Sequence, residues 1–344
     1  MTSDRNNPNR PDATGVFHPM SVRILTERDK RAEESAFLMN YCNPFLDDFL
    51  RGMMRQDLVL ISAPSGVGKT DFALNIAVEN AKRDRRVGFF ALEAKPQELE
   101  QRVKFSWIAT EAWRRNLDRR GELNYKDWLV HRCEDIVGGL DDAADEWITK
   151  NLSTLWTFYR GDDFGQSALT KAIRDHAHLF DLFVIDHLHY IDFDSDEETE
   201  NRAIAATMKA IRTVQQETKK PVILVAHLRK SDRRLKQLVP ELEDISGTKH
   251  VVNIATQGIT IAPALNIEAP KWWLAPTYIA VRKDRDGGSP PFVALTMFDK
   301  RNRSYQDTYS LGRLTKGGTE WEEIKAGDRP GWATSFKQLE MELG

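Results

Sequence analysis

One short segment of the sequence has the residue types and spacing needed to hold the phosphates of a nucleotide. An apolar run, DLVLIS, leads into GVGKT and then into a helical pattern, which matches the P-loop motif except that alanine stands at its first glycine. Gly66 and Gly68 allow successive backbone N–H groups to curl around phosphates. Lys69 supplies charge to the β and γ phosphates, and Thr70 offers a hydroxyl to Mg²⁺. We therefore predict an ATP and Mg²⁺ site over Ala63, Pro64, Ser65, Gly66, Val67, Gly68, Lys69, Thr70 and Asp71.

Polar side chains end the other apolar runs of the same half of the chain. Asp186 ends LFVID, where a carboxylate can orient Mg²⁺. Glu93 follows VGFFAL, where it can take a proton from the attacking water, although a solvated capping glutamate is the alternative for this residue alone. His227 ends PVILVAH, where a polar side chain can sense the γ-phosphate; in isolation it is typical of a structural histidine.

Histidines and cysteines raise the question of a transition metal. His187 and His189 lie on either side of Leu188, and together with His227 they suggest zinc, but no spacing signature of a zinc site supports it. Cys42 and Cys133 are far apart in the chain. Their separation argues against a disulfide framework and a structural zinc site, and it favours a reducing, cytoplasmic location.

The elements that must position these residues alternate between strands and helices. Four continuous apolar runs, DLVLIS, VGFFAL, LFVID and PVILVAH, are typical of strands covered on both faces, as in a parallel sheet. Helical patterns separate them, which predicts an α/β domain with a doubly wound, mostly parallel sheet. Three later runs, GITIA, TYIAVR and FVALTMF, are separated by glycine and proline turns, and we expect them to extend this sheet as antiparallel strands.

Length and charge limit the organisation of the chain. Its 344 residues carry 49 Lys and Arg against 52 Asp and Glu, a net charge of −3 that excludes a polybasic surface but not a local basic channel. No apolar run approaches the roughly 20 residues that span a bilayer, so we expect no membrane segment. The expected parts are a disordered tail (1–20), a possible linker helix (21–37), the α/β domain (38–310) and a C-terminal tail (311–344), in which two tryptophans suggest docking.

The order of these motifs resembles the RecA-like ATPase domain of DnaB-type hexameric replicative helicases. The similarity runs from about residue 40 to 307 and rests on SAPSGVGKTDFALNIA, FFALEAKPQELEQRV, GELNYKDW, VIDHLHYI, ENRAIAATMKAIR, PVILVAHLRK, LEDISGT and AVRKDRDG. The family usually has glutamine at the position of His227, and tyrosine and glutamine at those of His187 and His189. Because about 35 residues precede the similarity, we expect this chain to lack the family's N-terminal helical domain.

The resemblance implies a homo-oligomeric ring, usually a hexamer, with ATP bound between neighbouring subunits. In AVRKDRDG, Lys283 and Arg285 would reach the adjacent subunit's site, with Arg285 as the arginine finger. A solvated charge cluster at a strand end is the alternative that composition alone favours.

The resemblance also implies single-stranded DNA in the central channel. Loops after Asp186 and around residues 244–250 would hold it, while the acidic stretch FDSDEETEN is unsuited to line a channel for phosphates. The basic candidates for DNA contact are Arg229, Lys230, Arg233, Arg234 and Lys249, although a solvated loop explains the first four equally well.

Two functions are consistent with these features. The first is an ATP-driven motor that translocates on single-stranded DNA and unwinds duplex DNA, with primase or a loader as possible partners. The second is a RecA-like ATPase without unwinding activity, acting as a regulatory, loading or defence component. A P-loop kinase is disfavoured because nothing in the sequence resembles a substrate lid.

Overall fold

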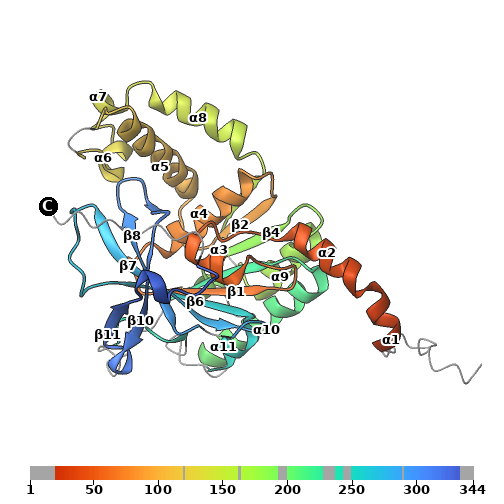
Figure 1. The fold of residues 1–344 in the computed structure, drawn as a ribbon. Coiled ribbons are helices and arrows are strands. Elements are labelled where there is room, and N and C mark those ends of the chain that lie inside the picture. Colours follow the sequence, from red (N-terminus) through yellow and green to blue (C-terminus); the bar gives the residue numbers. More distant parts are fainter. Residues whose placement is uncertain are drawn as a thin grey trace, which may run out of the picture.

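The computed structural model describes residues 20–118, 121–161, 164–192, 200–227, 237–242, 249–288 and 290–333. Its strands form one eleven-stranded sheet in the order β11-β10-β8-β7-β6-β1-β5-β4-β2-β3, with β9 paired to β8 (Figure 1). The strands are β1 (Leu58–Ala63), β2 (Val87–Ala91), β3 (Leu155–Tyr159), β4 (Leu182–Asp186), β5 (Val222–His227), β6 (Gln257–Pro263), β7 (Leu274–Asp284), β8 (Phe292–Asp299), β9 (Ser304–Tyr305), β10 (Ser310–Thr315) and β11 (Glu320–Glu323).

Helices lie between the strands and on both faces of the sheet. The α-helices are α1 (Met20–Arg23), α2 (Glu27–Phe37), α3 (Pro44–Leu50), α4 (Lys69–Ala81), α5 (Glu98–Arg114), α6 (Tyr125–Leu129), α7 (Glu134–Val137), α8 (Leu140–Asn151), α9 (Gln166–His176), α10 (Glu200–Thr218) and α11 (Lys249–Ile254). Short 3₁₀ turns are η1 (Ile24–Thr26), η2 (Leu188–Tyr190), η4 (Lys316–Gly318) and η5 (Ala326–Asp328).

The parallel part of the sheet is buried on both faces, as the continuous apolar runs predict. Every residue of β1, β2 and β4 is buried. Successive side chains of a strand point to opposite faces. Val59 and Ile61 therefore join the core under α3 and α4, while Leu58 and Leu60 join the core under α9 and α10. The predicted doubly wound α/β architecture is confirmed.

The antiparallel extension begins one strand later than the sequence suggested. We expected GITIA (258–262) to be antiparallel, but β6 pairs in parallel with β1. The reason is α11, a crossover helix that returns the chain to the start of the sheet before β6. Strands β7, β8, β10 and β11 then follow in antiparallel pairs.

The helix predicted from residue 96 to about 116 is α5, whereas strand β3 and helices α6–α8 escaped the sequence analysis. Strand β3 is at the edge of the sheet and alternates between half-buried and exposed residues, and Thr157 interrupts its short apolar run. Helices α5–α8 enclose a small core of their own, which includes Phe105, Ile108 and Leu140. Figure 1 shows this helical group standing apart from the sheet.

The ends of the described chain differ in how they meet the domain. The segment expected as a helix at 21–37 is helical through α1, η1 and α2, and it runs away from the sheet in Figure 1. The sheet continues past residue 310, where we expected a tail, because β10 pairs with β8 and β11 with β10. Trp321 packs on Tyr278 and Trp332 on Phe292. Among the described residues, no helix combines the length and apolar character needed to cross a bilayer.

A glycine in β10 tests whether the sheet extension is part of the folded core. An added Cβ on Gly312 would lie 2.3 Å from the Trp321 indole, so Gly312→Ala should lower the free energy of unfolding by about 1–3 kcal/mol. Denaturant unfolding measures this loss. The matched control is Gly331→Ala, where a Cβ meets nothing within 4 Å. Equal stabilities of the two variants would contradict the packing described for β10 and β11.

Candidate functional site

Four strand ends bring the predicted site residues to one edge of the sheet. The neighbours β1, β5, β4 and β2 run parallel, so their carboxyl ends meet at the same edge. In the strand register Ala63 lies opposite His227, and Asp186 lies opposite both Val225 and Ala91. The P-loop, His227, Asp186 and the segment carrying Glu93 therefore line this edge in that order.

The loop after β1 has the shape that phosphate binding requires. Gly66 and Gly68 both have φ of +83°, a conformation that side chains disfavour. A Cβ on Gly68 would also lie 3.1 Å from the ring of Phe298. The hydroxyl of Tyr305 donates a 3.0 Å hydrogen bond to the carbonyl of Val67, and α4 begins at Lys69. The loop thus places the positive end of a helix at the predicted phosphate site.

A lysine, a threonine and an aspartate form the centre of the site. Lys69 and Asp186 are only 7% and 1% exposed. Burial lowers the pKa of Lys69 and raises that of Asp186 to about 6, although the Thr70 hydrogen bond and the charge of Lys69 oppose the second shift. The Oδ1 atom of Asp186 is buried without a hydrogen-bond partner. A threonine hydroxyl beside an unpartnered carboxylate oxygen suits a Mg²⁺ ion.

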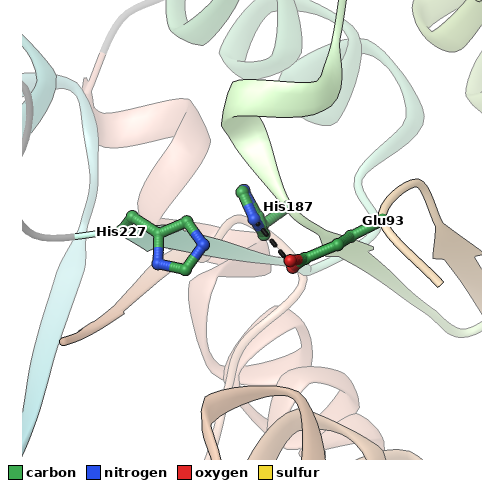
Figure 2. Close-up of side chains that lie close together, drawn as sticks. All are labelled: Glu93, His187 and His227. Carbon is green, nitrogen blue, oxygen red and sulfur yellow. Dashed lines mark ion pairs between the residues drawn. The ribbon is translucent and has the colours of Figure 1, made fainter. Parts of the chain in front are cut away.

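Glu93 lies at the mouth of this centre and contacts groups from two other segments. Its Oε2 is 3.9 Å from Nζ of Lys69 and 2.9 Å from Nε2 of His187, and its carboxylate accepts a hydrogen bond from Tyr190. Figure 2 shows Glu93, His187 and His227 converging. One ligand atom from each lies within 4.8 Å of the others.

The two histidines are held in their neutral form. His187 is fully buried, and its pKa falls to about 2, first through burial and then through the neighbouring His227, Lys69 and His189. Burial and the charge of Lys69 lower the pKa of His227 to about 4. The imidazole rings of His187 and His227 pack edge to face at 4.1 Å. Sequence spacing did not predict this approach, because 40 residues separate the two positions.

Asp71, which we predicted to contact the nucleotide, directs its carboxylate to arginines. It is buried and accepts two hydrogen bonds from Arg303, at 3.0 and 2.9 Å, and one from Arg102 at 3.3 Å. Its side chain therefore fastens α4 to α5 and to the turn before β9. Neither arginine was a site candidate, and the Glu98-x-x-x-Arg102 spacing within a helix was the sole sequence signal.

The turn between β8 and β9 also holds the helical group. The guanidinium of Arg301 lies 4.5 Å from the ring of Trp113 on α5 and 4.4 Å from that of Trp273. The same guanidinium pairs with Asp299. One turn therefore contacts the P-loop helix through Arg303 and the helical group through Arg301.

Lys283 and Arg285 lie at the opposite end of the sheet from the P-loop. The N–H of Arg285 donates to the carbonyl of Thr256, just before β6 pairs with the start of β1. Strand β1 separates that end from the P-loop by about 17 Å. The Nζ atom of Lys283 donates to the carbonyls of Val252 and Asn253 at the end of α11. Arg285 is exposed and forms no ion pair with a described residue.

Four of the five basic residues predicted to contact DNA lie outside the described residues, namely Arg229, Lys230, Arg233 and Arg234. Lys249 begins α11, but the position of its side chain is not among the described features.

Comparison with known proteins finds similar sequences among replicative DNA helicases. Curated relatives include the replicative DNA helicase DnaB of Geobacillus stearothermophilus, 29% identical over 58% of this chain and 41% of that protein. A probable replicative DNA helicase of Trieres chinensis is 30% identical over 53% of this chain and 38% of that protein. The chain thus spans about two fifths of the length of these relatives.

Solved structures show the same fold. One of them, described as an ATPase domain, superposes with a TM-score of 0.66 at 18% identity, over 83% of this chain and 96% of that one. A DnaB-like replicative helicase, described with its primase interactions, gives a TM-score of 0.67 at 17% identity, over 84% of this chain and 67% of that one. The family model for the DnaB-like helicase C-terminal domain matches residues 43–290. This chain belongs to the family of DnaB-like helicase C-terminal domains.

Proposed function

We infer that the chain is an ATP-hydrolysing, ring-forming motor that translocates on single-stranded DNA and unwinds duplex DNA. The observation that carries this proposal is the convergence of Lys69, Thr70, Asp186 and Glu93 at neighbouring strand ends. These four side chains supply the charge, metal ligands and base that phosphoryl transfer to water requires. The family to which the chain belongs supports the same activity.

The geometry suggests a separate role for each of these groups. The backbone of the P-loop and Lys69 would bind the β and γ phosphates. Thr70 and Asp186 would hold Mg²⁺, which when bound neutralises charge on those phosphates. Glu93 would accept the proton of the attacking water. The hydrogen bond from Tyr190 would hold this carboxylate at the mouth of the site.

Assembly into a ring would complete the site. Arg285 is exposed about one strand length from its own P-loop, so it is suited to act on the nucleotide of a neighbouring subunit rather than on its own. Apolar side chains at the start of the N-terminal helices are also exposed, with Met20 at 85%, Ile24 at 59% and Leu25 at 78%. We propose that this segment packs on the next subunit of a hexamer, as a linker helix would.

DNA would lie in the channel of that ring. Arg229, Lys230, Arg233, Arg234 and Lys249 follow the carboxyl end of β5 in the chain. We propose them as contacts with DNA phosphates. Primase or a loader protein would be the expected partner of such a ring, and a compartment with reducing chemistry suits its two free cysteines.

Replacing Glu93 separates nucleotide binding from hydrolysis. Glu93→Gln should leave ATP binding within a few-fold of wild type, because the P-loop is intact, and it should slow hydrolysis by about 10²–10⁴-fold. Lys69→Ala is the comparison variant, since it should weaken binding itself. Fluorescent-nucleotide binding and phosphate release measure the two steps. Undiminished turnover in Glu93→Gln would exclude this residue as the base.

Subunit mixing tests whether Arg285 acts across an interface. Arg285→Ala should lower turnover by about 10³-fold or more, the usual contribution of an arginine finger. In mixtures with wild type, turnover should fall more steeply than the wild-type fraction, because each variant subunit disables a neighbour's site. Arg132→Ala, a change at another exposed arginine, is the control. A strictly proportional fall would contradict a shared site.

The motor function is tested by DNA. Single-stranded DNA should raise the ATPase rate, and a forked duplex should be separated only when ATP is hydrolysed. Arg233→Ala combined with Arg234→Ala should weaken binding to single strands and reduce the salt slope by about 0.7 for each phosphate that the protein no longer neutralises. An ATPase that DNA does not stimulate, and that separates no fork, would instead be a RecA-like ATPase without unwinding activity.

A further inference from the structure

Three side chains from neighbouring strand ends form a cluster that the hydrolysis mechanism uses only in part. Glu93 follows β2, His187 follows β4 and His227 ends β5, and Figure 2 shows the carboxylate and both rings facing a common point. One potential ligand atom from each residue lies within 4.8 Å of the other two. Among the described residues, this is the one group of at least three His, Cys, Asp or Glu side chains with such spacing.

One imidazole nitrogen of each histidine in this cluster lacks a hydrogen-bond partner. Nε2 of His187 is buried 2.9 Å from Oε2 of Glu93, but at an angle that does not make a hydrogen bond. Nδ1 of His227 is also buried without a partner. Buried polar atoms are normally satisfied by protein, water or an ion. The unpartnered Nε2 of His187, with a carboxylate oxygen 2.9 Å away and a nitrogen of His227 nearby, therefore points to a ligand that accepts lone pairs.

Two imidazole nitrogens and one carboxylate oxygen are a donor set for a borderline transition metal. Zn²⁺ takes such ligands at 2.0–2.2 Å, whereas Mg²⁺ prefers oxygen ligands alone. Ligand atoms around a tetrahedral ion of this size are about 3.3 Å apart, so small side-chain rotations would close the cluster. Ligation through Nε2 places the ring proton of His187 on Nδ1, which breaks a long 3.4 Å hydrogen bond from the His189 amide.

The charges around the cluster set its selectivity. Glu93 contributes one negative charge, while Nζ of Lys69, 3.9 Å away, opposes a cation. The site therefore depends on covalent character in the metal–nitrogen bonds rather than on charge alone, a property of Zn²⁺ and not of Mg²⁺.

We propose that Glu93, His187 and His227 bind one divalent transition-metal ion of the Zn²⁺ class, and that the bound ion blocks Glu93 from acting as a base. Metal binding rests on the geometry of these three residues alone. The inhibitory effect rests in addition on the proposed function, since it requires Glu93 to take the proton of water.

Direct titration tests the binding step without nucleotide. The full chain, stripped of metal and carrying Cys42→Ser to remove its more accessible thiol, is titrated with Zn²⁺ by calorimetry and with Co²⁺ by visible absorption. One ion should bind per chain, with the Co²⁺ spectrum of a nitrogen and oxygen site. His227→Gln should weaken binding at least about tenfold. The matched control, His178→Gln, changes an exposed histidine and should bind as the parent does.

A second variant guards against misfolding. His187→Gln should also weaken metal binding. Thermal unfolding shows whether each variant folds. If His187→Gln does not fold, His227→Gln still tests the site, because His227 is only half-buried. Failure of Zn²⁺ and Co²⁺ to bind, or binding that both His227→Gln and His178→Gln retain equally, would overturn the site.

The inhibition step is measured separately. Under saturating Mg²⁺ and ATP, added Zn²⁺ should slow hydrolysis by the His178→Gln protein, and chelation followed by fresh Mg²⁺ should restore it. The inhibiting concentration should rise at least about tenfold for His227→Gln. Unchanged or faster hydrolysis with Zn²⁺ bound would refute inhibition. Zn²⁺ binding by a protein that never hydrolyses ATP would sustain the metal site and refute the proposed function.

Discussion

Alignment of the carboxyl ends of four buried parallel strands is the constraint on which the site depends. Strands β1, β5, β4 and β2 are adjacent, and each ends in, or leads into, a polar group that is costly to bury. Continuous apolar packing on both faces fixes their register, so the polar groups have little freedom to separate. The raised pKa of Asp186 and the lowered pKa of Lys69 follow from this placement at the boundary of the core.

The sequence predicted the parts of this arrangement that depend on local pattern. The glycine spacing of the P-loop, the position of Asp186 and the buried strands are all local features, and the fold agrees with them. Strand β3 was missed because it is only five residues long and Thr157 interrupts its apolar run. The direction of β6 was wrong in our prediction because the short helix α11, rather than the strand's composition, decides it.

The candidate site also has features that local sequence patterns predict and features that only the folded structure shows. Strand order, which no single-sequence pattern specifies, brings His187 and His227 together and leaves one potential ligand atom of each within 4.8 Å of one on Glu93. Spacing along the chain argued against a metal because the sequence motifs of zinc sites contain ligands that lie close together in the chain. The three potential ligands here come from the ends of separate strands. Asp71 is the opposite case, because a sequence motif suggested a contact that its side chain makes with other groups in the structure. Its position in the P-loop motif suggested contact with the nucleotide, but two arginines from distant segments take up its carboxylate.

The turn between β8 and β9 links the phosphate loop to the helical group. Tyr305 is bonded to Val67, Arg303 to Asp71, and Arg301 lies between two tryptophans, one of them on α5. These contacts couple α5 to the turn mechanically. If α5 moves further than side-chain rotations can absorb, either Trp113 separates from Arg301 or the turn moves with the helix. A displacement of the outer helices would therefore be passed through this turn to the P-loop.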